Sequence, residues 1–471
     1  MKHILILFTD EQRPDTIHAL GNEVIQTPNL DALARDSVVF ENCITPSPVC
    51  VPARLSLFTG QYPARTGCNI NNKETVYEGN GFYSQITEEG YQSCCIGKMH
   101  HLPDLYGPMG FEKRLTQEGT PNVADDYANF VREKYPHVFD YHGMRSEMYY
   151  VPQISPLPPS DHPTQWVGDR SVEYIEACDP ERPMFLMSSF YHPHPPFSPP
   201  APWNKLYRED PQGVFAPDAE TLADYKELLG NNTCERLMMS EQDVLRLKNY
   251  YYACISFVDY QIGRIIKALK DKGMYEDTLI IFTSDHGEMI GDYHALGKRT
   301  MMDPACRVPF LVHYPGVKPE TRKVPCSLVD VAPTVLSYIG ADYDKASFDG
   351  IDLFSDERHD YVYSQYGSGK KGTYMVTDGQ NKLVLNTATD RYFFFDTVPN
   401  DRNTYDLSNP KVQELKAALD AYRDSDVNRD SEAVACENNF KKHPHYSARH
   451  DQVLFHDEEA AAIPEGYRID L

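Results

Sequence analysis

The stretch HILILFTDEQ, residues 3–12, decides the fold that we predict for this chain of 471 residues. Its apolar part, HILILF (3–8), is continuous rather than alternating, which is typical of a β-strand covered on both faces. Strands of this kind belong to parallel sheets that carry helices on both sides. Asp10 and Glu11 follow this strand at once, so we expect a polar site at its carboxyl end.

Four further runs share this continuous apolar character: YQSCCIG (91–97), PMFLMSSF (183–190), TLIIFT (278–283) and PFLVHY (309–314). Helical patterns lie between them, and the clearest covers residues 240–272. Ser240 and Asp243 can form a capping box at its start, and Gly273 ends it. Strands that alternate with helices indicate an α/β fold with a doubly wound, mostly parallel sheet.

The composition changes near residue 355, where we place a domain boundary. Beyond it, TYMVTDGQNKLVLN (373–386) and RYFFFD (391–396) predict antiparallel strands, and NPKVQELKAALDAYRDS (409–425) predicts an amphipathic helix. We therefore expect a larger domain over 1–355 and a smaller α+β domain over 356–471. The smaller domain would end in a solvated tail whose histidines lack a metal-ligand spacing: His443, His445, His450 and His456.

Residues 115–240 are rich in proline, tyrosine and aspartate and only weakly periodic. We interpret this region as long insertions and loops, which in α/β folds often shape a substrate pocket.

The composition argues against several classes of partner. A formal net charge of -24 disfavours nucleic acid and anionic membranes, and no apolar run approaches the length of a membrane span. The run ILILF is too short for a signal peptide, so we expect a cytoplasmic protein. The eleven cysteines form no CxxC pair, which favours reduced thiols. A local cationic pocket could still bind a small anion, because salt screens charge beyond about 8 Å.

Charged and imidazole side chains follow four of the predicted strands, at the point where each strand ends. In open α/β sheets, ligands bind outside the carboxyl ends of the strands. One such residue is more often a helix cap or an ordinary loop residue, but four similar strand ends favour a shared site. We expect one crevice to gather Asp10, Glu11, Lys98, His100, His194, Asp285 and His286.

This set of residues is suited to a metal and an anion together. Carboxylate oxygens with one imidazole suit a hard divalent cation better than they suit zinc, which favours thiolates. We expect Ca²⁺, with Mg²⁺ or Mn²⁺ as alternatives. The candidate ligands are Asp10, Glu11, Asp285 and His286. Positive charge and donors would come from Arg54, Lys98, His100, His194 and Lys298. A metal with several cationic groups stabilises charge that builds up on a sulfate or phosphate oxygen.

Cys50, in TPSPVCVPARLSLFTG (45–60), is the candidate nucleophile. A metal ligand, a redox thiol and a small buried side chain are the other interpretations of this residue. The redox interpretation is disfavoured because no resolving cysteine stands in a CxxC arrangement with it.

The motif CVPAR (50–54) resembles the signature of the type I sulfatases of the alkaline-phosphatase superfamily, whose core is Cys/Ser-x-Pro/Ala-x-Arg. Their TGxYPxxxG element is matched by TGQYPARTG (59–67). Other stretches resemble family blocks and follow in family order: QTPNLDALARDSVVFENC (26–43), GKMHH (97–101), SFYHPHPPF (189–197), TSDHGEMIGDYHALGKRTMMDPACRVPF (283–310), DVAPTVLSYIG (330–340) and TYDLSNP (404–410). The resemblance covers essentially residues 3–420.

This resemblance implies a large mixed, mostly parallel sheet sandwiched by helices, with a catalytic domain over 1–355 and the smaller C-terminal domain. It implies hydrolysis of a carbohydrate or aryl sulfate monoester to alcohol and inorganic sulfate. Cys50 would be oxidised to formylglycine by a formylglycine-generating or anaerobic sulfatase-maturating enzyme. One hydroxyl of the hydrated aldehyde would attack sulfur, and the second would then expel sulfate, so that water need not attack the sulfate ester.

The resemblance also implies a role for each residue of the crevice. The metal ligands would be Asp10, Glu11, Asp285, His286 and the modified Cys50. Arg54 would hold the diol and the metal ligands, while Lys98 and Lys298 would grip sulfate oxygens. His100 would assist deprotonation of the diol, and His194 would bind sulfate or protonate the leaving oxygen.

Some residues depart from the family pattern and leave alternatives open. Ala53 stands where many members have Ser, and Glu11 where Asp or Gln is common. The Asp285–His286 pair also occurs in relatives that cleave phosphonate monoesters and phosphodiesters, so such a hydrolase is the rival prediction. A non-catalytic protein that binds sulfated glycans is the third. We interpret the extra His101 as a surface loop residue rather than a specificity residue.

The sequence also leaves room for a homo-oligomer.

Overall fold

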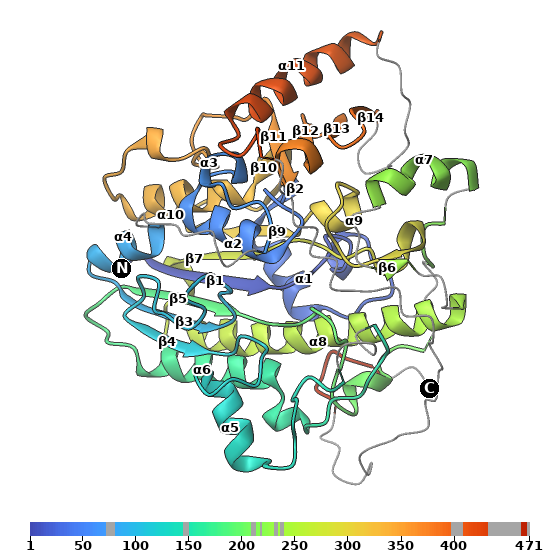
Figure 1. Cartoon of the computed structure of the whole chain (residues 1–471). Helices are drawn as coiled ribbons and strands as arrows, with labels where there is room; N and C mark the ends of the chain where they lie inside the picture. The colour runs from blue at the N-terminus through green and yellow to red at the C-terminus, as the bar shows by residue number, and fades with distance from the viewer. Residues whose placement is uncertain are drawn as a thin grey trace.

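An eight-stranded sheet lies at the centre of the computed structural model, in the order β10-β2-β9-β7-β1-β5-β3-β4 (Figure 1). Its strands are β1 (His3–Thr9), β2 (Val38–Ile44), β3 (Gln92–Gly97), β4 (Lys113–Thr116), β5 (Met184–Ser189), β7 (Thr278–Ser284), β9 (Phe310–His313) and β10 (Glu320–Ser327). Only β9 runs antiparallel to its neighbours in this sheet, and the other pairs are parallel. The predicted mixed, mostly parallel sheet is confirmed.

The structure describes residues 1–71, 81–144, 150–208, 213–216, 219–229, 234–235, 240–396, 408–431 and 463–468. The four tail histidines and most of TYDLSNP lie outside these ranges, so the predictions made for them stay predictions.

The central strand β1 shows why its apolar run is continuous. It pairs in parallel with β5 on one side and β7 on the other. Ile4, Ile6 and Phe8 belong to the hydrophobic core on one face of the sheet, and Leu5 and Leu7 belong to the core on the other face. Both faces are covered, so no position of the strand can be polar without a partner.

Helices cover each face of the sheet. The helices α2 (Cys50–Thr59), α4 (Phe82–Glu88) and α10 (Val331–Ile339) pack on one face. The opposite core is formed with α1 (Pro28–Arg35), α5 (Asp126–Lys134), α6 (Pro163–Ala177) and α8 (Glu241–Asp271). Figure 1 shows α2 and α10 on one side of the strands and α6 and α8 on the other. Short elements complete this part: α3 (Pro63–Thr66), α7 (Ala219–Leu229), α9 (Asp303–Cys306), and the β6 (Cys234–Glu235) and β8 (Ala295–Leu296) pair.

The long helix α8 matches its prediction closely. Its N-cap is Ser240, whose hydroxyl accepts from the Asp243 amide while the Asp243 carboxylate accepts from the Ser240 amide, which is the predicted capping box. Along its length, residues such as Val258, Ile262 and Ile265 pack toward the sheet.

The interpretation of residues 115–240 as insertions and loops is wrong in part, because α5, α6 and α7 lie in it. Helix α6 has 15 residues and buries Trp166, Val167 and Ile175. Their spacing is too sparse, among many polar residues, to stand out as a helical pattern. Packing against α8 and the sheet, rather than a strong apolar period, makes this segment helical.

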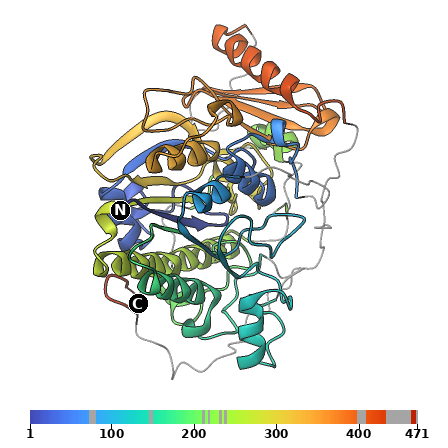
Figure 2. The same ribbon diagram turned by 90° about the vertical axis from the view of Figure 1, so that its left-hand side faces the viewer.

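A second sheet follows near the C-terminus, with four antiparallel strands in the order β11-β12-β13-β14. These are β11 (Val362–Tyr366), β12 (Thr373–Thr377), β13 (Lys382–Asn386) and β14 (Arg391–Phe395), and α11 (Pro410–Ser425) packs on one face. The other face packs against residues that include Ile44, Val49 and Met302. Figure 2 shows this sheet between α11 and the larger sheet. The predicted smaller α+β part is confirmed, and the division at residue 355 stays a prediction.

Two further observations concern membrane-spanning helices and cysteines. Within the described ranges, no helix combines the length and the apolar character that crossing a membrane requires. Nine of the cysteines in the described ranges are buried and form no disulfide bond.

We expect Ile262→Ala to lower the free energy of unfolding by about 2–5 kcal/mol, because it leaves a cavity between α8 and the sheet. Ile262 is fully buried. Urea denaturation followed by circular dichroism measures this loss. The control is Lys267→Ala on the same helix, where the exposed Lys267 pairs with Asp271 at the surface and this pair is worth roughly 0.5 kcal/mol or less. Equal losses for the two variants would contradict the proposed packing of α8.

Candidate active site

Four neighbouring strands bring the predicted residues together. The strands β7, β1, β5 and β3 are adjacent and parallel, so their carboxyl ends meet at one edge of the sheet. Asp10 follows β1, Lys98 follows β3, Asp285 follows β7, and His194 lies in the loop after β5. Strand order therefore brings these predicted residues together.

Cys50 is the first residue of α2, and its side chain points into this edge of the sheet. Its Sγ lies 3.2 Å from His286 Nε2 and 3.8 Å from Asp10 Oδ1. The ammonium of Lys298 lies 3.3 Å from the same sulfur. Cys50 is only 1% exposed, so it faces the charged cluster and not bulk water.

Arg54 ties α2 to the ends of three strands of the sheet. Its Nη2 donates to Asp10 Oδ2 at 2.9 Å, and its Nε donates to Asp285 Oδ2 at 2.8 Å. Its Nη1 donates to the backbone oxygen of Lys98 at 2.8 Å. Arg54 lies four residues after Cys50, one turn along the helix, so both side chains lie on the same face. This explains the spacing of the CVPAR motif.

The two aspartates differ in their electrostatic surroundings. Burial by itself would raise the pKa of Asp10, but Lys98, His194 and Arg54 hold that pKa well below its usual value. The Lys98 Nζ lies 2.5 Å from Asp10 Oδ2. Burial, together with the charge of Asp10, raises the pKa of Asp285. Asp10 is thus the more firmly ionised of the two carboxyls.

Glu11 is held in an unusual backbone conformation. Its φ is 65°, a region that few non-glycine residues adopt. The Tyr251 hydroxyl donates to its backbone oxygen at 2.7 Å, and the Glu11 amide donates to Asp285 Oδ1 at 3.1 Å. These bonds direct the carboxylate into the cluster, where Oε1 contacts Lys298 and lies 3.3 Å from His194 Nε2. Its Oε2 is buried without a hydrogen bond to the described residues.

His286 has an orientation that suits a ligand. Its Nδ1 lies 2.9 Å from the backbone oxygen of Gly287, which fixes the proton on Nδ1. Its Nε2 therefore presents a lone pair toward Cys50.

The ligand atoms form two overlapping groups, each with all atoms within 4.8 Å of one another. One group is Asp10, Glu11, Cys50 and His194, and the other is Asp10, Cys50, Asp285 and His286. Together they contain the five predicted metal ligands, and His194 joins the first group beyond that prediction. Three carboxylates with imidazole fit a hard divalent cation, and so does the buried Oε2 of Glu11, which has no hydrogen bond to another described residue.

The two lysines of the cluster respond differently to burial. Burial opposes the charge of Lys98, but Asp10 and Cys50 raise the pKa of Lys98 above its usual value. Burial lowers the pKa of Lys298 to about 7, against the attraction of Asp10. Both ammonium groups reach the residues around Cys50, as the sequence predicts.

His100 lies in a tight turn that another residue holds. Its φ is 53°, and the Glu118 carboxylate accepts from the amides of Met99 at 2.8 Å and His100 at 3.0 Å. Arg114 pairs with Glu118. Burial and the charges of Lys98 and Arg54 hold the pKa of His100 well below its usual value. The imidazole is therefore neutral.

The interpretation of His101 as a surface loop residue is wrong. It is 3% exposed, and its ring centroid lies 5.2 Å from that of Phe58. Burial, with Arg114 and Arg54 nearby, lowers its pKa to about 3. His101 therefore packs against Phe58 of α2, directly after the tight turn at His100.

Three supporting residues were missed by the sequence reasoning. Glu118 lay in a region interpreted as loops, and Tyr251 lies inside an ordinary helical pattern, so neither had a signal. Ser189 ends β5 and donates through Oγ to the backbone oxygen of Lys98. Its position at the carboxyl end of β5 is the sequence signal that could have identified it.

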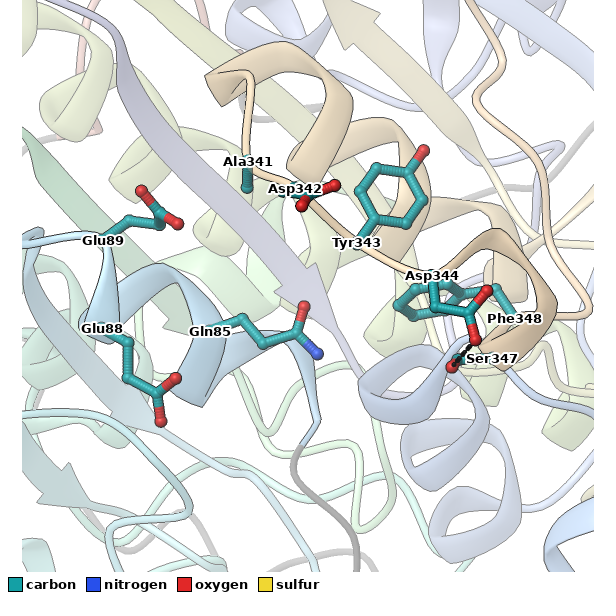
Figure 3. A pocket seen from close by; sticks show the side chains of 9 residues that line it. All are labelled: Gln85, Glu88, Glu89, Ala341, Asp342, Tyr343, Asp344, Ser347 and Phe348. Carbon is teal, nitrogen blue, oxygen red and sulfur yellow. Dashed lines mark hydrogen bonds between the residues drawn. The ribbon is translucent and has the colours of Figure 1, made fainter.

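A pocket of about 270 Å³ lies away from this cluster, between α4 and the segment after α10 (Figure 3). Its lining includes Glu88, Glu89, Asp342 and Tyr343, and none of the predicted site residues belongs to it. Because β3 begins shortly after α4 ends, this pocket lies toward the opposite edge of the sheet.

Comparisons with known proteins identify the family of this chain. A sequence model of the family described as Sulfatase matches residues 2–341. The chain is 29% identical over 452 residues to an arylsulfatase of Clostridium perfringens, covering 89% of this chain and 92% of the relative. It is 28% identical over 440 residues to a choline-sulfatase of Rhizobium meliloti, covering 90% and 85%.

Solved structures share the fold. A phosphonate monoester hydrolase from Silicibacter pomeroyi has a TM-score of 0.77 at 22% identity and covers 91% of this chain and 96% of its own. A 2-O GAG sulfatase has a TM-score of 0.72 at 19% identity, covering 95% and 98%. The family match spans well over half of the residues, and the sheet topology agrees with it. The chain therefore belongs to the sulfatase family of the alkaline-phosphatase superfamily, and it is a sulfuric ester hydrolase.

Proposed function

We propose that this chain hydrolyses a carbohydrate or aryl sulfate monoester, using a formylglycine made from Cys50 and one divalent metal ion. The observation that carries the proposal is the surroundings of Cys50. Its side chain is buried among Asp10, His286 and Lys298, at distances between 3.2 and 3.8 Å. A side chain at position 50 therefore contacts both the proposed metal ligands and the ammonium of Lys298.

An unmodified thiol suits this position poorly as a nucleophile. Burial, and then the charge of Asp10, raises the pKa of the Cys50 thiol well above its usual value. A thiol nucleophile must be ionised to react, so a neutral buried thiol would be inert. Formylglycine, once hydrated, would supply oxygen nucleophiles at the position where Sγ now lies.

The proposed metal ligands are Asp10, Glu11, Asp285, His286 and the modified residue 50, and Ca²⁺ is the first choice over Mg²⁺ or Mn²⁺. A divalent ion there would supply positive charge that polarises the sulfate group. Asp10 and Asp285 are already aligned by Arg54. The imidazole of His286 is oriented by Gly287, and such outer contacts commonly fix metal ligands.

The remaining residues have roles that follow from their positions. Lys98 and Lys298 would bind sulfate oxygens, since both ammonium groups reach the edge of the metal-ligand set. A neutral His100 is suited to accept a proton from the hydrated residue 50. His194 would bind sulfate or donate a proton to the leaving oxygen, and its Nε2 faces the cluster at Glu11.

Further predictions concern the partners, the location and the alternative functions of the chain. The chain would need a formylglycine-generating or anaerobic sulfatase-maturating enzyme as a partner during its synthesis. A cytoplasmic location and a homo-oligomer remain our predictions, as does the absence of nucleic-acid and membrane partners. The relatives named for aryl and choline sulfates support a small sulfate monoester as substrate. Hydrolysis of phosphonate monoesters or phosphodiesters by the same machinery is the alternative, and binding of sulfated glycans without turnover is the remote one.

Modification of Cys50 is tested by mass spectrometry of active protein. Cleavage after Arg35 and Arg54 releases residues 36–54, which contain both Cys43 and Cys50. We expect Cys43 to react with an alkylating reagent, while residue 50 carries a carbonyl oxygen in place of sulfur. Cys43 is an internal control for accidental oxidation. Fully alkylated Cys50 in catalytically active protein would sink the formylglycine assignment.

Metal binding is tested by thermal unfolding of chelator-treated protein. Adding Ca²⁺ at about 100 times its Kd should stabilise the fold by about 2.7 kcal/mol, and Mg²⁺ and Mn²⁺ are compared at the same concentration. Asp10→Asn should abolish the shift because it removes a ligand charge. Asp259→Asn is the control, since Asp259 is buried against Asn29 and Tyr467 outside the site. A shift that survives in Asp10→Asn would rule out the proposed ligand set.

Substrate preference is tested with matched aryl sulfate and aryl phosphonate esters that share one leaving group. We expect the larger kcat/KM for the sulfate, and we expect Cys50→Ala to lower it by about 10³-fold or more, because it removes the nucleophile. A larger kcat/KM for the phosphonate would favour the alternative hydrolase. Tight binding of sulfated glycans without turnover of either ester would favour the binding protein.

A further inference from the structure

Tyr191 lies between two of the proposed sulfate-binding residues. The ammonium of Lys98 lies over its ring, 4.8 Å from the centroid. The ring of His194 lies 4.7 Å from the same centroid. Tyr191 is 3% exposed and does not belong to the ligand groups around Cys50. It is therefore placed to affect both residues without touching the reacting position.

The hydroxyl of Tyr191 and the ring of His194 share one acceptor. The Tyr191 OH donates to the backbone oxygen of Pro195 at 2.9 Å. The Nδ1 of His194 lies 2.7 Å from that same oxygen, so Nδ1 carries the proton that it donates. In addition, the His194 amide donates to the Tyr191 backbone oxygen at 3.1 Å. These bonds aim His194 Nε2 at the cluster, where it faces Glu11.

The Tyr191 ring itself has little room to move. The ring of His142 lies 3.9 Å away, centroid to centroid. A Cβ on Gly119 would come within 2.3 Å of the Tyr191 ring, and Gly119 has a φ of +81°. Glycine at this position therefore allows the close approach that seats the ring. A ring packed in this way can hold the charged groups beside it in one arrangement.

We propose that Tyr191 is a positioning residue that aligns the ammonium of Lys98 through its ring and the imidazole of His194 through its hydroxyl. The assignment rests on the proposed function for the roles of these two residues. The ring attracts the Lys98 ammonium and keeps it beside the sulfate-binding edge. The hydroxyl fixes the Pro195 carbonyl, which in turn accepts from His194 Nδ1–H and turns Nε2 toward the cluster. Nε2 must carry a second proton to donate to the leaving oxygen, so the imidazolium is the form that acts as the acid.

The two functions of Tyr191 can be separated by substitution. Tyr191→Phe keeps the ring beside Lys98 and removes the hydroxyl, so only the alignment of His194 should suffer. Tyr191→Leu removes both interactions. Tyr127→Phe is the matched control, because Tyr127 is fully buried and also donates to a backbone oxygen, that of Asp161 at 2.6 Å, away from the site.

The kinetic readout is the dependence of kcat/KM on the leaving group in a series of sulfate esters. For Tyr191→Phe we expect near wild-type values with good leaving groups and a loss of about tenfold or more with poor ones, since only poor leaving groups need the proton. Tyr191→Leu should lose activity with every ester and raise KM, because Lys98 is also displaced. Tyr127→Phe should behave like the wild type. The assignment is overturned if Tyr191→Phe lowers kcat/KM equally for all esters, or if it changes kcat/KM for none of them.

A second readout does not depend on turnover. The imidazole ¹⁵N signals of His194, identified by their loss in His194→Ala, report which nitrogen carries the proton. We expect Nδ1 to keep its proton in the wild type, whether or not Nε2 is also protonated, and we expect a fraction of Tyr191→Phe to lack the proton on Nδ1. An unchanged signal would contradict the positioning role. If the ¹⁵N signals of His194 change in Tyr191→Phe as expected but the wild-type chain cleaves no sulfate ester, the proposed function is refuted and the positioning role stands.

Discussion

The guanidinium of Arg54 is the interaction on which the rest of the site depends. It lies 2% exposed between the carboxylates of Asp10 and Asp285, which follow the neighbouring strands β1 and β7. Two carboxylates buried side by side would repel each other and would each lose hydration, at a cost of several kcal/mol per ion. Arg54 offsets both effects. Because it lies one helical turn beyond Cys50, the same bonds fix residue 50 over the ends of the strands.

The charges around this anchor nearly balance. The carboxylates of Asp10, Glu11 and Asp285 are matched by Arg54, Lys98 and Lys298, although the whole chain carries a net charge of -24. Charges held in place by a folded scaffold need little rearrangement when a substrate arrives, which is the main source of electrostatic catalysis. The scaffold is supplied by groups outside the cluster, such as Glu118 beneath the His100 turn and Tyr251 beside Glu11.

Prediction succeeded where the signal was local and failed where it was not. The run HILILF and the capped helix at 240–272 were predicted correctly, because burial on both faces and a capping box leave a direct mark on a few consecutive residues. Helix α6 was missed, because its sparse apolar residues gain their helical structure from packing against α8. His101 was misread as exposed because no pattern in GKMHH reveals the tight turn at His100 or the packing of His101 against Phe58.

The sequence by itself determined the class of fold, the strands that end in charged residues, and the motif that joins Cys50 to Arg54. Each of these is a short-range property, written in apolar periodicity, capping residues or helical spacing. Only the tertiary structure decided that β7, β1, β5 and β3 are neighbours, that Glu118 holds His100, and that Tyr191 lies between Lys98 and His194. Those relations join residues far apart along the chain, and close packing of the whole fold sets the distances between them.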